Sequence, residues 1–392
     1  MRNSAFLSFL TLLLFKQKSK HIGAILISII IIFLLSSVLF ISSSLQESLQ
    51  ESLKQQPDFV VSRFEAGRAV NTPIEWMDKI IEIDGVTSVT PRIYGRYFYA
   101  ANQESFLLIG VDFFDEQSSK ALKELSSTLD LKSFLETPSM LVGQGVGEFM
   151  QNHYYRDTFS FKLPNGTFKK VTIETVLPSS TNLIANDMIV MPIELAREIF
   201  GLADEVVTDI AFNVPNDAEW DNILAKIHLL FYDVRVIDKR EVSKAYRTLY
   251  NYKGGLFLIL YLVTIITFML ILYQRYSMVY SAEKREIGIL RAIGWSIKDI
   301  LKLKFYETLI VVVSSFVLGV VLAYTYVFIL DAPLLQNIFL GSTNLANSVE
   351  FIPTVKFGTL GSIFLFFAVP FFAAVLIPVW KIAVTPPKEA ML

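Results

Sequence analysis

Cysteine is absent from the chain, and histidine is scarce. Without cysteine the protein forms no disulfide bond and offers neither a thiolate metal site nor a cysteine nucleophile. His21, His153 and His228 lie far apart and lack the spacing of metal ligands, so solvated or core histidines are the simpler interpretation. The sequence contains neither GxxxxGKS/T nor GxSxG, which argues against a nucleotide-binding P-loop and a serine hydrolase.

The chain is nearly neutral and strongly apolar. Its 35 Lys and Arg against 37 Asp and Glu give a formal net charge of −2, which argues against nucleic acid as the main partner. Hydrophobic residues make up 53% of the chain, and the mean hydropathy is +0.48. The chain is too apolar for a wholly soluble protein, while its middle is too charged for a purely membrane one. We therefore expect both membrane-spanning and soluble parts.

Four apolar runs are long enough to cross a bilayer, because about 20 residues span a hydrocarbon core of roughly 30 Å. Lys16, Lys18 and Lys20 precede the first run, and Lys381 and Lys388 follow the last. Since basic residues mark the cytoplasmic side, both termini are predicted to be cytoplasmic. The apolar start of the chain predicts a helix lying on the inner leaflet. A cleaved signal peptide fits less well, because no small-residue cleavage site follows cleanly.

These runs and the polar segments between them predict the organisation of the whole chain. Two polar, helix-compatible segments are expected to continue the first and second spans as stalks. In order, we predict a cytoplasmic interfacial helix (1–21), a first span (22–41), a stalk helix (42–56), an extracytoplasmic domain (57–238), a second stalk helix (239–253), a second span (255–277), a cytoplasmic segment (281–301), a third span (305–330), an outer loop (331–354), a fourth span (355–379) and a cytoplasmic tail (380–392).

The sequence of the extracytoplasmic domain predicts mixed α and β structure. A strand, helix, strand order appears near its start, with a break expected in the second strand at Pro91, and again near its end. Two such halves can pair into one ferredoxin-like lobe. The stretch of about 115–205 between them predicts an inserted β-rich lobe with a hairpin around Gly166, and the glycines of LVGQGVGEF are expected at turns and bulges.

The cytoplasmic segment 281–301 has the pattern of an amphipathic helix. Its apolar residues recur every three or four positions, and charged residues fill the other positions. Gly294 interrupts the pattern and is expected to stop or kink the helix. A charged helix held between two spans could pass force between a soluble partner and the membrane. An interfacial helix that only rests among the lipid headgroups is the alternative.

Two parts of the sequence resemble one known family. The run REIGILRAIG, followed by Glu307 at the start of the next apolar helix, resembles the cytoplasmic loop of FtsX-like ABC transporter permeases, which include MacB-type and lipoprotein-releasing permeases. The ending IPVWKIAVTPPKEAML resembles the region after the last membrane helix of that family. The large central region is similar in layout to the MacB-type periplasmic domain.

The resemblance implies a non-catalytic permease subunit in the bacterial inner membrane. A separate cytoplasmic ABC ATPase would bind ATP and Mg, and the permease would form a homodimer or heterodimer among membrane lipids. The implied contacts to the ATPase are Glu283, Arg285, Glu286, Ile287, Leu290, Arg291 and Gly294. The chain itself is expected to carry no cofactor and no metal.

Two features of the third span are further candidates. Ser315, Gly319 and Ala323 lie four residues apart, a spacing of small residues that permits close helix packing. Glu307 lies about one turn inside the cytoplasmic end, where it could reach water or pair with Lys302 or Lys304. The family resemblance adds a possible role for Glu307 in coupling.

The cargo stays open at this point. Release of lipoproteins and MacB-like export through a periplasmic adaptor would both use this architecture. A third alternative transports nothing and is a signal transducer that activates a periplasmic cell-wall hydrolase.

Overall fold

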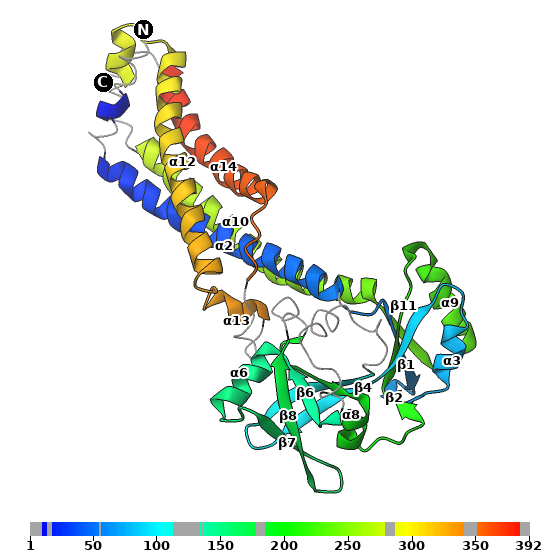
Figure 1. The fold of residues 1–392 in the computed structure, drawn as a ribbon. Helices are drawn as coiled ribbons and strands as arrows, with labels where there is room; N and C mark the ends of the chain where they lie inside the picture. The colour runs from blue at the N-terminus through cyan, green and yellow to red at the C-terminus, as the bar shows by residue number, and fades with distance from the viewer. Residues whose placement is uncertain are drawn as a thin grey trace. The chain divides into compact units, whose positions relative to one another are not determined.

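The structure, a computed structural model, describes residues 10–13, 18–54, 56–112, 134, 136–177, 185–278, 287–340 and 351–384 (Figure 1). The chain divides into two compact units. We call the first, Met1–Ser44, Asn251–Pro333 and Pro353–Leu392, the helical unit, and the second, Leu45–Tyr250 and Leu334–Ile352, the sheet unit.

The described chain contains four helices that are long and apolar enough to cross a membrane. They confirm the expected four-span architecture, with a large α/β domain between the first and second spans. The predicted stalks are continuous with the spans, because α2 and α10 each run through both segments without a break. The helices are α2 (Lys18–Lys54), α10 (Lys239–Met278), α12 (Ile297–Phe328) and α14 (Phe357–Val384).

Aromatic contacts join the helices of the helical unit. Phe316 of α12 meets Phe364 of α14 edge-on at 5.2 Å between ring centroids, and Phe33 of α2 meets Tyr326 of α12 at 5.3 Å. Such edge-to-face pairs stabilise packing beyond the burial of their area. A short helix, α13 (Leu335–Leu340), lies in the loop between the third and fourth spans.

Ten strands of the described chain form one sheet in the sheet unit, in the order β12-β1-β11-β4-β5-β9-β6-β8-β7 with β2 paired to β1. β3 (Thr72–Pro73) and β10 (Val206–Val207) pair separately. The strands of the large sheet are β1 (Phe59–Glu65), β2 (Arg68–Val70), β4 (Thr87–Tyr99), β5 (Glu104–Val111), β6 (Ser139–Val142), β7 (Thr158–Lys162), β8 (Phe168–Val176), β9 (Met188–Pro192), β11 (Asp209–Asn213) and β12 (Val234–Asp238).

The four strands β12-β1-β11-β4 form the ferredoxin-like lobe that the sequence predicts. All neighbouring pairs among them are antiparallel, and α3 (Trp76–Ile81) and α9 (Trp220–Leu230) connect them. The two helices lie side by side in Figure 1 although they are far apart in the sequence. The two helices pack on the sheet through four buried side chains, Trp76, Ile80, Ile223 and Ile227. The first and last parts of the domain's sequence therefore share one core.

The insertion extends this sheet and does not stand apart as a separate lobe. β5 pairs with β4 along eight residues, and β9, β6, β8 and β7 follow it outward. α8 (Ile193–Phe200) and α6 (Gln144–Asn152) add their apolar faces to the same core as α3 and α9. The expected hairpin is present between β7 and β8, with Gly166 at φ +84° in its turn.

Two local expectations are wrong. β4 runs through Pro91 without a break. The Arg92 carbonyl accepts a hydrogen bond from the N–H of Thr208, the residue before β11, so the neighbouring Pro91 nitrogen faces the other edge of the strand. There the pairing with β5 begins only at Arg92, so no hydrogen bond is lost. The glycines of LVGQGVGEF lie in and before α6. A Cβ on Gly143 would meet the Ala185 carbonyl oxygen at 1.9 Å, so close packing requires glycine there.

Candidate functional site

The described part of the predicted cytoplasmic segment starts at Ile287 and is helical to residue 292. Its end is a glycine C-cap. The Trp295 N–H donates to the Leu290 carbonyl at 3.0 Å, the Gly294 N–H donates to the Arg291 carbonyl at 3.1 Å, and Gly294 has φ +100°. This pair of bonds satisfies carbonyls that a helix end leaves unpaired. Gly294 therefore stops the helix, one of the two outcomes expected for it.

Replacing Gly294 with alanine is expected to destabilise this turn by about 1–2 kcal/mol, because a Cβ disfavours the left-handed backbone. Its Cβ would meet nothing within 4 Å, so any effect comes from the backbone alone. Gly294→Asn should cost less, since asparagine tolerates this region. Thermal unfolding of the purified chain in detergent measures both variants, and equal stability of Gly294→Ala and the parent would contradict the prediction.

From Ile287 onward, the predicted segment 281–301 contains the end of one helix and the start of a second. Ser296 caps a new helix, α12, which starts at Ile297 and continues into the third span. The Asp299 N–H donates to the Ser296 hydroxyl at 3.2 Å, and the Asp299 carboxylate accepts from the Ser296 N–H at 3.1 Å. This reciprocal capping box fixes the start of α12 at Ile297, so the helix that contains the third span begins before residue 305, the predicted start of the span. We call residues 287–294 the connecting helix.

The connecting helix is seated on the ends of the third and fourth spans. Ile287 is buried in a cluster with Ile300 of α12 and with Val379 and Ile382 of α14. The Arg291 guanidinium donates to the Ala383 carbonyl at 2.5 Å, one residue before α14 ends. A cation is favourable at a helix C-terminus, where carbonyls are unpaired. Arg291, predicted to touch an ATPase, thus joins two helices of this chain.

Two isoleucines project from the opposite side of the connecting helix. Ile289 is 47% exposed and Ile293 is 68% exposed, and their spacing of four residues places them on one face. Leu290, predicted to contact the ATPase, is only half-buried, and Gly294 is exposed at the end. Glu283, Arg285 and Glu286 lie outside the described residues. The exposed surface of the described connecting helix is therefore apolar at its centre.

Glu307 is buried with two basic side chains. Its carboxylate lies 2.9 Å from the Lys304 ammonium and 3.3 Å from Nε2 of His21 at the start of α2. All three side chains are buried, and Glu307 is only 3% exposed. The predicted pairing with Lys304 is confirmed, whereas Lys302 is exposed. The cluster fastens α2 to α12 near one end of both helices.

The small residues of α12 lie against α2. Ser315, Gly319 and Ala323 are all buried. A Cβ added at Gly319 would come within 2.8 Å of the Cβ of Ile32 and within 3.2 Å of the Ile29 carbonyl oxygen. The spacing predicted to permit close packing thus lies where the two helix backbones approach each other.

Sequence reasoning missed His21 and the contact of Arg291 with α14. His21 was interpreted as an isolated histidine, and only the approach of α2 to α12 shows its partner. A signal was present, since His21 and Glu307 are ionisable residues at the edges of two apolar runs. Arg291 carried no such signal, because its acceptor is a backbone carbonyl.

The described residues offer no group of three or more His, Cys, Asp or Glu that could hold a metal ion. In the sheet unit, Arg92 and Asp209 form a buried pair with hydrogen bonds of 2.8 and 2.9 Å. Burial alone would lower the pKa of Arg92, but the charge and hydrogen bonds of Asp209 raise it overall, so the guanidinium keeps its charge although it is buried.

Comparison with known proteins finds a matching family and a number of similar solved structures. The family described as FtsX-like permease C-terminal matches residues 258–387. No curated protein matches the chain. The periplasmic region of MacB from Actinobacillus actinomycetemcomitans is similar at 9% identity and a TM-score of 0.30, covering 48% of this chain and 91% of that one. The extracellular domain of a noncanonic ABC-type transporter, YknZ, from Gram-positive bacteria is similar at 11% identity and a TM-score of 0.29, covering 46% and 99%.

Proposed function

We propose that this membrane protein, whose residues 258–387 match the family described as FtsX-like permease C-terminal, is the permease subunit of an ABC transporter. A separate cytoplasmic ATPase binds ATP and Mg and hydrolyses the nucleotide. The permease pairs with a second permease, identical or homologous, in the bacterial inner membrane with both termini in the cytoplasm. Motion of the permease drives its outer domain, which releases or exports a substrate such as a lipoprotein.

The observation that carries this proposal is the seating of the connecting helix. Its buried side is fastened to α12 and α14 through Ile287 and Arg291, while Ile289 and Ile293 face outward. A helix that presents apolar residues four positions apart fits the groove of a partner protein. A partner that pulls on these isoleucines would act on the third and fourth spans, rather than on the second and third as the sequence alone suggests.

The helices α2 and α10 complete the mechanical path. Each continues from an apolar span into the predicted stalk as one helix, so it can carry motion along its axis. Force from the ATPase would enter at the connecting helix and pass along α12 to α2. The cluster of His21, Lys304 and Glu307 holds these two helices together.

Changing Ile293 to aspartate tests the coupling. We expect this variant to lose binding to the co-purifying ABC ATPase by about tenfold or more, because losing a central apolar anchor costs about 2 kcal/mol or more and about 1.4 kcal/mol is a factor of ten. Stimulation of ATP hydrolysis should fall with it. Pull-down and ATPase measurements on co-expressed proteins in detergent give both readouts.

The matched control is Ile81→Asp, because Ile81 is a similarly exposed isoleucine, 50% exposed, in the sheet unit. It should leave ATPase binding and stimulation unchanged. Arg291→Glu would be a poor test, since it also breaks the contact with α14. If Ile293→Asp binds and stimulates the ATPase as the parent does, the connecting helix is not the coupling surface.

A further inference from the structure

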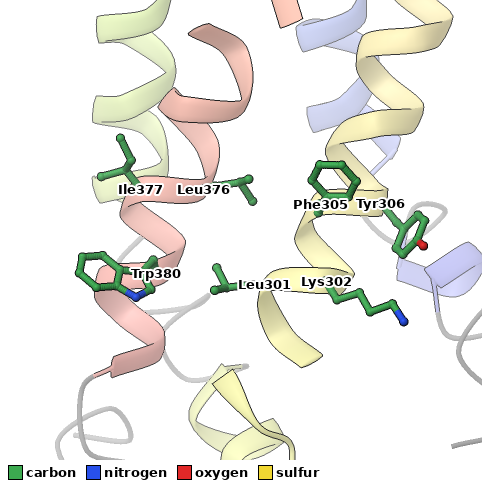
Figure 2. Close-up of a pocket in the computed structure, with 7 residues that line it drawn as sticks. All are labelled: Leu301, Lys302, Phe305, Tyr306, Leu376, Ile377 and Trp380. Carbon is green, nitrogen blue, oxygen red and sulfur yellow. The ribbon is translucent and has the colours of Figure 1, made fainter. Parts of the chain in front are cut away.

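A groove lies between α12 and α14 in the helical unit (Figure 2). Figure 2 shows that the Lys302 ammonium and the Tyr306 hydroxyl both point away from α14. No charged side chain of the described lining therefore points into the groove, and apolar side chains such as Leu301 and Leu376 line it. Such a surface is usual for spanning helices, which meet lipid tails. A charged feature of a different kind lies in the sheet unit, where α10 begins.

The helix α10 starts directly on the sheet. β12 ends at Asp238 and α10 begins at Lys239, with no residue between them. Asp238 pairs with Phe59 of β1, and its carboxylate accepts a hydrogen bond from the Glu241 N–H at 2.6 Å. Aspartate is favoured in this position, because its carboxylate satisfies an N–H that the start of a helix leaves unpaired. The first turn of α10 is therefore bonded to the strand that precedes it.

Asp58, the residue before β1, ties the start of α10 to two more strands. Its carbonyl accepts from the Lys239 N–H at 2.8 Å, and its carboxylate lies 2.8 Å from the Lys239 ammonium. The same carboxylate accepts from the Val214 N–H at 3.1 Å, and the Asp58 N–H donates to the Asn213 side chain at the end of β11 at 3.0 Å. Both side chains of the ion pair are largely buried, at 22% and 18% exposed, and such charge-assisted hydrogen bonds are among the strong ones.

Arg240 ties the start of α10 to α9. Its guanidinium donates to Asp221 of α9 at 2.6 Å and to Asp238 at 2.8 Å, and lies 5.0 Å from the ring centroid of Trp220. Trp220 is buried and meets Phe59 edge-on at 5.0 Å. The pair with Asp221 is exposed and contributes little by itself. Together, however, the first two residues of α10 are bonded to β1, β12 and α9.

The other stalk enters the sheet unit differently. α2 ends at Lys54 and β1 begins at Phe59, so residues 55–58 lie between them. The Lys54 ammonium pairs with Glu51 of its own helix at 2.7 Å, and this pair is exposed. The basic residue at the end of α2 thus pairs within its helix, whereas the basic residues at the start of α10 pair with the lobe.

We call the contacts of Asp58, Asp221, Asp238, Lys239 and Arg240 the α10 mount. Bonds to several elements of one core fix both the position and the direction of a helix, whereas a single contact would let it pivot. We propose that the α10 mount makes the ferredoxin-like lobe move with α10 as one rigid body, so that α10, of the two stalks, sets the orientation of the lobe. The source of the motion rests on the proposed function, while the rigidity needs no ATPase.

Spin labels on the full chain test the mount. Because the chain lacks cysteine, two introduced cysteines are the only labelling sites. Ala225→Cys in α9 and Ala245→Cys in α10 replace exposed residues, and double electron–electron resonance in detergent should give one narrow distance distribution. In Lys239→Met the fraction of molecules at other distances should rise by about tenfold or more, because a hydrogen bond between charged groups is lost. Lys239→Arg should keep the narrow distribution.

Two further variants make the test specific. Asp58→Asn removes the charge but keeps an acceptor for the Val214 N–H, so it should broaden the distribution as Lys239→Met does and still tests the mount if Lys239→Met does not fold. Lys54→Met is the matched control on the other stalk, and should leave the distribution unchanged. A broad distribution in the parent, no broadening in Lys239→Met and Asp58→Asn, or equal broadening in Lys54→Met would overturn the proposal.

Measurements with the co-purifying ATPase keep this proposal and the proposed function apart. When ATP and vanadate are added, the distance between Ala225→Cys and Ala245→Cys should stay constant, and a change in the parent would overturn the mount. The distance between Ala225→Cys and Phe357→Cys, an exposed position at the start of α14, should change. If it does not change while the distribution across the mount stays narrow, the result counts against the proposed function alone.

Discussion

Replacing Glu307 with leucine should lower the free energy of unfolding by about 3–5 kcal/mol, which is the cost of removing one partner from a buried ion pair. Glu307 is buried beside Lys304, at 2.9 Å, and His21, at 3.3 Å. Without the carboxylate the Lys304 ammonium would stay buried and unpaired. Thermal unfolding of the purified chain in detergent, followed by far-UV circular dichroism, measures the loss.

A second substitution separates the ion pair from the size of the side chain. The double variant Lys304→Met with Glu307→Leu removes both charges and should recover most of the stability, because two apolar side chains of similar volume can replace a buried pair at little cost. Lys298→Met, which removes an exposed lysine of the same helix, should have little effect. A Glu307→Leu variant as stable as the parent would show that the cluster does not fasten α2 to α12.

Replacing Gly319 with leucine should separate α2 from α12 at a cost of about 1–3 kcal/mol, the usual penalty for overpacking. Even the first added carbon would lie 2.8 Å from the Cβ and Cγ2 of Ile32. Because α12 leads from the connecting helix to α2, this variant should also reduce ATPase stimulation under the proposed function. Unfolding and ATPase measurements on the same preparation give both results.

Gly361→Leu is the matched control, because Gly361 is also a helical glycine of the helical unit and a Cβ there meets nothing within 4 Å. Both variants gain the same helix propensity, so their difference isolates the contact with Ile32. Adding Ile32→Ala to Gly319→Leu should recover part of the stability by making room. If Gly319→Leu and Gly361→Leu behave alike, the close approach of the helices does not matter for stability.

The spans could be predicted from the sequence because the membrane imposes a local rule. About 20 consecutive apolar residues suffice to identify a spanning helix, whatever lies around it. The end of the connecting helix could be predicted for an equally local reason, since Gly294 acts through its own backbone conformation. The exact start of α12 was not predicted. It depends on a hydroxyl and a carboxylate three residues apart, Ser296 and Asp299, and the amphipathic pattern of the segment does not show that they cap a new helix.

Within the sheet unit, the order of strands and helices indicated the ferredoxin-like lobe, but not how the insertion joins it. β5 and β9 pair in parallel although about eighty residues separate them, and no local pattern encodes such a pairing. The predicted strand break at Pro91 was wrong for a similar reason. Whether a proline breaks a strand depends on which neighbour its nitrogen faces, and that neighbour is set by the completed sheet.

Four features could be predicted from the order of residues: the four spans, the α/β domain between the first two, the glycine that ends the connecting helix and the small residues of α12. Hydropathy, periodicity and the backbone freedom of glycine act within a few turns of chain. The packed helices were needed to show that His21 meets Glu307, that Arg291 donates to the Ala383 carbonyl and that Ile289 and Ile293 face outward. These contacts join residues up to 286 positions apart, since 307 − 21 = 286. Their partners are a buried charge and a backbone carbonyl, which become available only when the helices have packed.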